Sequence, residues 1–186
     1  MGTMISSGTD VVSFLKEQHV QVKGLFERVL SLRGDARTKA FIELRRTMAV
    51  HETAEEEIVH PVARRNLPNG QKIVEARLQE ENEAKRVLSE LERYGIDSPE
   101  FETKLRKLQA AVLAHAESEE RTEFDRLANM LDQSKLERMR KAVKFAESVA
   151  PTHMHPSIGE SQAANVLVGP FASMLDRARD AISGKS

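Results

Sequence analysis

The chain of 186 residues contains no cysteine. This absence excludes a disulfide scaffold, a thiolate zinc site, an iron–sulfur cluster and a cysteine nucleophile. Tryptophan is also absent, there is one tyrosine, and aromatic residues make up only 4% of the sequence. Any metal ion must therefore be bound by histidine, by carboxylates or by that single tyrosine.

Long hydrophobic runs and an excess of one charge are also missing. No apolar run approaches the roughly 18 residues of a membrane-spanning helix, and no hydrophobic signal segment follows the N-terminus. The net charge is -1 and both signs are interspersed, which gives no electrostatic case for nucleic acid or an anionic membrane. We therefore expect a cytoplasmic protein whose partners include neither nucleic acid nor a membrane.

The sequence does contain four long stretches in which apolar residues recur at steps of three and four. This pattern is typical of amphipathic helices. The connections between the stretches are short, which favours antiparallel neighbours. We therefore expect an all-α fold, an up-down-up-down four-helix bundle with extra C-terminal helices. The four expected bundle helices span residues 10–32, 36–66, 71–94 and 99–131.

Three regions are expected along the chain. Residues 1–9 should be disordered, residues 10–131 should form the bundle, and residues 132–186 should form a helical extension. Within the extension, one helix is expected near 134–149 and a short amphipathic helix near 170–182. The short helix should dock on the bundle or on a second copy of the chain, so a homodimer is one expected assembly.

Each apolar stripe contains polar residues near its mid-length. His51 and Glu55 are four residues apart, which places them on the same buried helix face, and His115 and Glu119 repeat that pair. Burying a carboxylate without a partner costs several kcal/mol or keeps it protonated. A metal ion would remove that cost. The six polar members of the stripes are His19, His51, Glu55, Glu81, His115 and Glu119.

Antiparallel packing brings mid-helix positions to a similar level, so these six residues are expected to meet in one buried site. Imidazoles and carboxylates without sulfur suit iron, manganese, zinc or cobalt. Six ligands exceed the four of structural zinc and favour two metal ions about 3.5–4 Å apart, bridged by Glu55 and Glu119. The spacing of four residues differs from the spacing of three in ferritin-type di-iron bundles. The alternative is a hydrogen-bonded core network without metal.

Three motifs resemble those of the hemerythrin-like (HHE cation-binding) family. They are Gln18-His19 in the first helix, His51-Glu52-Thr53-Ala54-Glu55 in the second and His115-Ala116-Glu117-Ser118-Glu119 in the fourth. The likeness covers residues 10–130 and looks like a bacterial, actinobacterial branch with a C-terminal extension. It implies a non-haem di-iron centre with two Fe ions, Mn or Zn being alternatives. Glu52 is a further candidate ligand, because some family members use the residue after this histidine.

The third helix departs from the pattern of oxygen-carrying hemerythrins, which have two histidines there. Arg77 and Glu81 occupy those places, so the site is rich in carboxylates, which favour ferric iron. We therefore expect interaction with O2 or peroxide in oxygen or iron sensing, or in handling oxidative stress, rather than O2 transport. A peroxide-consuming (catalase-like) or oxidase activity is compatible with this site, and no sequence feature identifies a substrate.

Two other functions are consistent with the sequence: an iron-dependent regulatory module that signals through residues 132–186, and a metal-free structural bundle. His60 follows His51 by nine residues, nearly the opposite side of an ideal helix, so it is expected at the surface or behind the ligands. His153 and His155 should lie in a polar turn or close over the metal. Arg77 should pair with a neighbouring glutamate or form a surface salt bridge.

Overall fold

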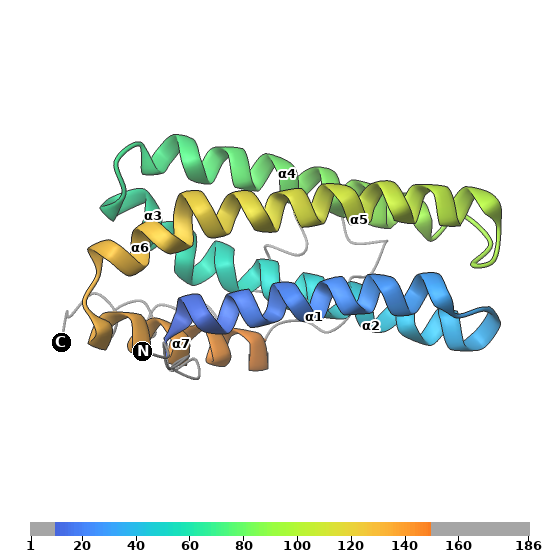
Figure 1. The fold of residues 1–186 in the computed structure, drawn as a ribbon, viewed down its shortest axis with the longest axis horizontal. Coiled ribbons are helices and arrows are strands. Elements are labelled where there is room, and N and C mark those ends of the chain that lie inside the picture. Colours follow the sequence, from blue (N-terminus) through green and yellow to red (C-terminus); the bar gives the residue numbers. More distant parts are fainter. Residues whose placement is uncertain (1–9, 150–186) are drawn as a thin grey trace, which may run out of the picture.

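The computed structural model describes residues 10–149, and every regular element in that range is helical. Figure 1 shows the long helices running up and down beside one another, with α1 against α2 and α4 against α5. The predicted all-α, up-down-up-down bundle is therefore confirmed. Its elements are α1 (Val11–Ser31), α2 (Gly34–Ala54), η1 (Glu55–Val59), α3 (His60–Asn66), α4 (Gly70–Leu91), α5 (Pro99–Glu119), η2 (Glu120–Phe124), α6 (Asp125–Met130) and α7 (Gln133–Val149).

The helix starts use the capping residues that the sequence indicates. The Asp10 side chain accepts a hydrogen bond from the backbone N–H of Ser13 (2.9 Å) at the start of α1. The Ser98 hydroxyl likewise accepts one from the backbone N–H of Phe101 (3.1 Å), and Pro99 occupies the first turn of α5. These bonds satisfy backbone donors that the first helical turn leaves unpaired.

The second and fourth bundle helices each contain one π-helical turn. The turn η1 joins α2 to α3 without a break, and η2 joins α5 to α6 in the same way. A π-turn accommodates one extra residue, so it shifts which residues face the core beyond it. Both π-turns begin at or directly after a predicted ligand, Glu55 or Glu119.

The bundle interior consists of two apolar clusters with a polar layer between them. One cluster contains Leu15, Ile58 and Phe124, and the other contains Phe26 and Leu44 with their neighbours. His19 lies on α1 between the residues that belong to these two clusters. The predicted site residues therefore occupy the middle of the bundle, with a packed hydrophobic core on each side.

The helix α7 packs on the outside of the bundle, against α1, α2 and η1. Its buried side consists of Leu136, Met139, Ala142, Val143 and Ala146. The prediction of an extra C-terminal helix is therefore confirmed. Residues 1–9, the helix expected near 170–182, His153 and His155 lie outside the described residues.

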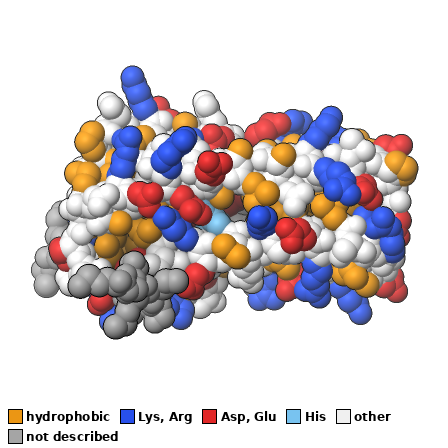
Figure 2. All heavy atoms as spheres, viewed as in Figure 1, with side chains coloured by type: hydrophobic (Ala, Val, Ile, Leu, Met, Phe, Trp, Pro, Cys, Tyr) orange, Lys and Arg blue, Asp and Glu red, His pale blue; other side chains and the backbone are white. Residues whose placement is uncertain are grey.

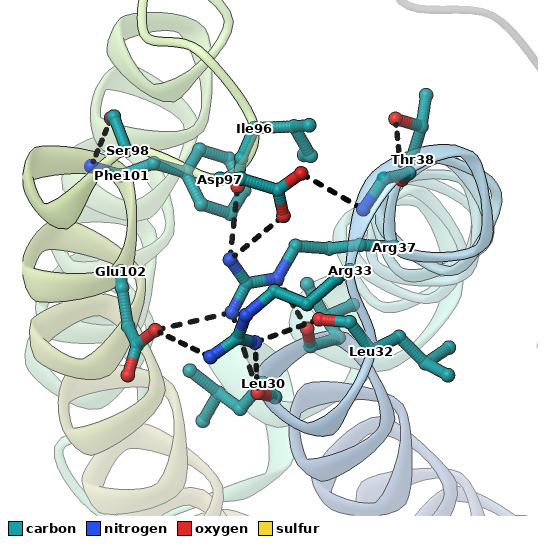
Figure 3. Close-up of polar contacts among 12 residues, drawn as sticks. Leu30, Leu32, Arg33, Arg37, Thr38, Ile96, Asp97, Ser98, Phe101 and Glu102 are labelled. Atoms are coloured by element: carbon teal, nitrogen blue, oxygen red, sulfur yellow. Dashed lines mark hydrogen bonds and ion pairs between the residues drawn. The ribbon is translucent and has the colours of Figure 1, made fainter.

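At the end of the bundle farthest from α7, a buried arginine joins two loops. Arg37 is fully buried and donates hydrogen bonds to the backbone oxygens of Val29 (2.9 Å), Ile96 (3.1 Å) and Leu30 (3.3 Å). It also donates to the Glu102 carboxylate at 3.2 Å (Figure 3). These contacts tie the α1–α2 connection to the α4–α5 connection and fix the relative position of the two helix pairs.

The face shown in Figure 2 carries positive and negative side chains in mixture, with no area of one sign. This agrees with the net charge of -1. Among residues 10–149, no helix is both long and apolar enough to cross a membrane.

Candidate metal centre

The structure brings all six polar members of the apolar stripes together at mid-length. Within residues 10–149 they fall into groups whose possible ligand atoms all lie within 4.8 Å of one another. Glu55 belongs to two of these groups, and so does Glu119. The groups are His19, His51, Glu55 and Glu119; Glu55, Glu81 and His115; and His60, Glu119 and Glu123.

The Nε2 atoms of three histidines face the shared carboxylates. The Nε2 atom of His51 lies 3.1 Å from a Glu55 oxygen, and that of His19 lies 3.5 Å from a Glu119 oxygen. The Nε2 atom of His115 lies 3.6 Å from the same Glu119 oxygen. Histidines from three helices, α1, α2 and α5, therefore converge on two carboxylates.

The opposite ring nitrogen of each of these histidines is bonded to an outer residue. The Nδ1 atom of His51 lies 2.8 Å from Gln18 Oε1, that of His19 lies 2.8 Å from Glu120 Oε1, and that of His115 lies 2.7 Å from Glu80 Oε2. Because these oxygens accept hydrogen bonds, each Nδ1 carries the proton. The Nε2 lone pairs remain directed at the cluster, which is the arrangement of metal-binding histidines.

Several buried polar atoms of the cluster have no hydrogen-bond partner in the described part of the chain. They are His19 Nε2, both carboxylate oxygens of Glu55 and of Glu119, and one oxygen of Glu81. Unpaired buried carboxylate oxygens are costly in a core. Nitrogen and oxygen donors in this number fit a transition-metal ion.

Comparison with known proteins agrees with this geometry. The family model of the hemerythrin HHE cation binding domain matches residues 10–127. The chain belongs to the hemerythrin HHE cation-binding family. The resemblance seen in the sequence motifs is thereby confirmed, and the HHE domain covers the four-helix bundle with its polar layer.

Individual relatives of this HHE domain are distant. A protein named DNA nickase from Nostoc sp. is 24% identical over 154 residues, which is 80% of this chain but 43% of the Nostoc protein. An uncharacterized hemerythrin-like protein of Schizosaccharomyces pombe is 25% identical over 134 residues, 72% of this chain and 66% of that one. The chain therefore spans less than two thirds of either relative.

A solved structure has the same fold. It is a hemerythrin HHE cation-binding domain-containing protein from Mycobacterium kansasii, with a TM-score of 0.66 and 20% sequence identity. The likeness covers 91% of this chain and 98% of the other.

Burial changes the proton affinities of this HHE site. It lowers the pKa of His51 to about 3, helped by the nearby His19, so His51 stays neutral near pH 7. It also raises the pKa of Glu55 well above the usual value, and the adjacent Glu119 carboxylate adds to the effect. In His19, the Glu119 and Glu120 carboxylates outweigh burial and raise the pKa. The metal-free site therefore retains protons that a cation would replace.

Glu52 is buried, as expected of a ligand candidate, but it belongs to none of the three groups in the described residues. The ammonium of Lys85 lies 3.6 Å from its carboxylate. Burial raises the pKa of Glu52 to about 8, although Lys85 acts in the opposite direction. Glu52 lies beside the centre and its role as a ligand stays a prediction.

His60 is a further functional candidate. The helical periodicity of the sequence predicted the wrong orientation for it. Of its two expected positions, the one at the surface was wrong, because its exposed fraction is 1%. The other, behind the ligands, agrees with its contact with the proposed ligand Glu81. The π-turn η1 absorbs one residue, so the rotation from His51 to His60 corresponds to about eight helical steps rather than nine. His60 consequently faces the core, where it contacts Glu81 at 2.9 Å.

Two further residues were missed or misjudged. Glu123 is fully buried and lies 2.9 Å from the Nδ1 atom of His60. Its spacing of four from Glu119, the same as that between His115 and Glu119, was the available signal. Arg77 is buried rather than at the surface, and it donates to Glu80 at 2.9 Å, which confirms the predicted pairing with a neighbouring glutamate.

A cavity of about 600 Å³ lies beside the cluster and extends between α4 and α5. His19, His51 and His115 form part of its wall. Figure 2 shows a histidine side chain at the bottom of a hollow in the middle of one face. The cavity therefore gives a small ligand a path to the histidines. Its apolar wall includes Val22, Met48, Ala84, Val87, Leu108 and Val112.

Proposed function

We propose that this HHE domain binds a non-haem di-iron centre through the six clustered residues, with Glu52 as a further candidate ligand. The observation that carries the proposal is the position of Glu55. It is fully buried, both of its oxygens lack hydrogen-bond partners among residues 10–149, and it belongs to two of the ligand groups. A carboxylate in that position can bridge two ions. The ligands are His19, His51, Glu55, Glu81, His115 and Glu119.

Iron is favoured over the alternatives by the donor set and by the family. Three imidazoles and three carboxylates suit iron and manganese, whereas a structural zinc ion needs only four ligands. Manganese and zinc remain the alternative metals. Bound iron would supply redox chemistry toward O2 or peroxide, while the protein residues hold the ions and keep His51 in the neutral form.

The cavity supports O2 or peroxide as the ligand. It reaches three of the proposed histidine ligands and has a largely apolar wall, which suits a small, weakly polar molecule. Only three histidines are present in the centre, and Arg77 and Glu81 occupy the positions of the third-helix histidines of oxygen carriers. We therefore infer oxygen or iron sensing, or a role in oxidative stress including peroxide consumption or an oxidase reaction, rather than O2 transport.

The test is the metal content, by elemental analysis, of untagged protein expressed in iron-supplemented medium, together with its ultraviolet–visible spectrum. Near two irons per chain with a charge-transfer band supports the proposal, and reaction with peroxide and O2 is measured next. No bound metal, with a melting temperature indifferent to added iron, contradicts it. The variant His51→Ala should lose metal, and unchanged content and spectrum would overturn the assignment. Glu117→Gln is the control, because Glu117 is exposed on the same helix as His115.

One contact favours a second function, an iron-dependent regulatory module that signals through the C-terminal extension. This contact joins the proposed metal centre to α7. Gln18 contacts His51 through its oxygen and donates from its Nε2 atom to Glu147 of α7 at 2.6 Å. An iron-dependent change at His51 would therefore reach the C-terminal extension. Limited proteolysis of the extension with and without iron tests this regulatory function. Cleavage independent of iron contradicts it. A metal-free structural bundle instead predicts that EDTA leaves the melting temperature unchanged.

A further inference from the structure

A second buried cluster adjoins the proposed di-iron centre at the end of the bundle that contains α3 and α6. His60 is its middle member. The Nε2 atom of His60 lies 2.9 Å from Glu81 Oε1, and its Nδ1 atom lies 2.9 Å from Glu123 Oε1. Both ring nitrogens thus contact carboxylates, so one of them must release its proton before it can bind a cation. The cluster connects to the proposed centre through Glu81 and Glu119.

The carboxylates of this cluster are fully buried and incompletely paired. Glu119 and Glu123 have no exposed surface, and His60 has an exposed fraction of 1%. The second oxygen of Glu123 and both oxygens of Glu119 have no hydrogen-bond partner among the described residues. A single imidazole therefore leaves three buried carboxylate oxygens without a donor, and these oxygens are available to a cation.

The ligand atoms are close enough to share one ion. One atom each from His60, Glu119 and Glu123 lies within 4.8 Å of the others. Transition-metal ions bind nitrogen and oxygen at about 2.0–2.2 Å, so two ligands of one ion lie within about 4.4 Å of each other. The three atoms must therefore draw closer together to bind one ion, which requires rotation of their side chains.

We propose that His60, Glu119 and Glu123 form an additional position for a divalent transition-metal cation, next to the di-iron centre and joined to it by Glu119. One imidazole and two carboxylates suit Fe²⁺, Mn²⁺ or Zn²⁺. The inference rests on the proposed function in one respect, which is that the neighbouring centre binds iron. The additional position has its own ligands, because His60 and Glu123 belong to no other ligand group among residues 10–149.

The two π-turns explain how the additional position forms. The turn η1 ends where His60 begins and rotates this residue into the core, and η2 contains Glu123. The last two residues of η2, Glu123 and Phe124, are both buried. Both π-turns thus change the residues presented beside the centre, and π-turns occur frequently at functional sites.

The experiment titrates the chelator-treated, full-length protein with Zn²⁺, which has no redox chemistry, and counts equivalents by calorimetry and elemental analysis. The wild type should bind one equivalent more than Glu123→Gln and His60→Gln, which should keep the equivalents of the neighbouring centre. The exposed control Glu117→Gln should match the wild type. Circular dichroism verifies that each variant is folded.

A second background separates the two sites. In His51→Ala the di-metal centre is impaired, but one equivalent should remain at the additional position, and adding Glu123→Gln should remove it. Equal stoichiometry and affinity in wild type, Glu123→Gln and His60→Gln would overturn the inference while leaving the proposed function intact. Loss of all metal from folded Glu123→Gln would also overturn it, because Glu123 would then belong to the centre itself. Absence of metal from the wild type would overturn both proposals.

Discussion

Gln18 directs the imidazole of His51 toward Glu55. The Gln18 oxygen lies 2.8 Å from the Nδ1 atom of His51, and the Nε2 atom of the same ring lies 3.1 Å from the Glu55 carboxylate. The Gln18 amide nitrogen is itself fixed by Glu147, so its oxygen must face the histidine. One amide therefore determines the tautomer and the direction of a proposed metal ligand.

Replacing Gln18 with leucine should weaken metal binding about 10–100-fold, which is the usual effect of removing the residue that orients a ligand histidine. The fold should persist, because a leucine fills a similar volume. Calorimetric titration of the chelator-treated protein measures the change. Gln21→Leu is the control, since Gln21 is exposed on the same helix. An affinity equal to that of the wild type would show that His51 needs no orienting partner.

Replacing Glu52 with glutamine should stabilise the metal-free protein near pH 7 but not near pH 4. The pKa of Glu52 rises from 4.5 in the unfolded chain to about 8 in the folded protein. Between these values the folded state retains a proton that the unfolded state loses, so the free energy of unfolding falls as pH rises. Each pH unit in this range lowers the free energy of unfolding of the wild type by about 1.4 kcal/mol. The free energy of unfolding is therefore about 3 kcal/mol lower at pH 7 than at pH 4.

Urea unfolding of chelator-treated protein at both pH values measures this difference, with Glu117→Gln as the exposed control. A stability gain of the same size at pH 4 would contradict the raised pKa. The variant also tests the ligand role of Glu52. If Glu52 binds metal, Glu52→Gln should bind metal more weakly than the wild type, even though its metal-free form is more stable.

Replacing Arg37 with methionine should lower the free energy of unfolding by about 3 kcal/mol, because the backbone oxygens of Val29 and Ile96 lose the donor that Arg37 provides. Arg33 provides the matched control: its side chain is 60% exposed, and Arg33→Met should change stability by less than about 0.5 kcal/mol. Urea unfolding measures both. Metal affinity should be unchanged in both variants, since Arg37 packs at the end of the bundle, away from the polar layer.

Substitution by alanine should lower the thermal stability of the protein at Gly70 and raise it at Gly24. A methyl group on Gly70 would lie 2.3 Å from the backbone oxygen of Ala63, so Gly70→Ala must push α3 and α4 apart. Gly24 lies within α1 with nothing within 4 Å of its added carbon, and alanine there should stabilise the helix by about 0.5–1 kcal/mol. Thermal unfolding compares the two. A stabilised Gly70→Ala variant would mean that the α3–α4 contact is looser than the structure shows.

The arrangement of the bundle was predictable because its signals are local and repeated. His19, His51 and Glu81 each interrupt a regular apolar stripe, and antiparallel helices of similar length bring their mid-points together. The burial of Arg37 was not predictable, because its partners are backbone oxygens at the end of α1 and in the α4–α5 connection, which only the folded chain brings together.

The error in the orientation of His60 has a physical cause. Sequence periodicity assumes about 100° per residue throughout a helix, and a single π-turn breaks that assumption without changing the helix boundaries. The second helix was therefore predicted with its length nearly correct and with the orientation of His60 wrong. An apolar pattern that changes phase after a histidine–glutamate pair is the sign of such a turn.

Because a polar layer separates the two apolar cores, the metal-free bundle has apolar packing at both ends and little of it in the middle. Each end of the bundle has its own packed interior, while the middle contains carboxylates that lack hydrogen-bond donors among residues 10–149. A helix ordinarily frays first at its termini. Here the unpaired carboxylates lie near the centres of the helices instead. A bound cation would connect the helices at this layer and couple the two apolar cores into one cooperative unit. Loss of the metal would then loosen the packing in the middle of the bundle.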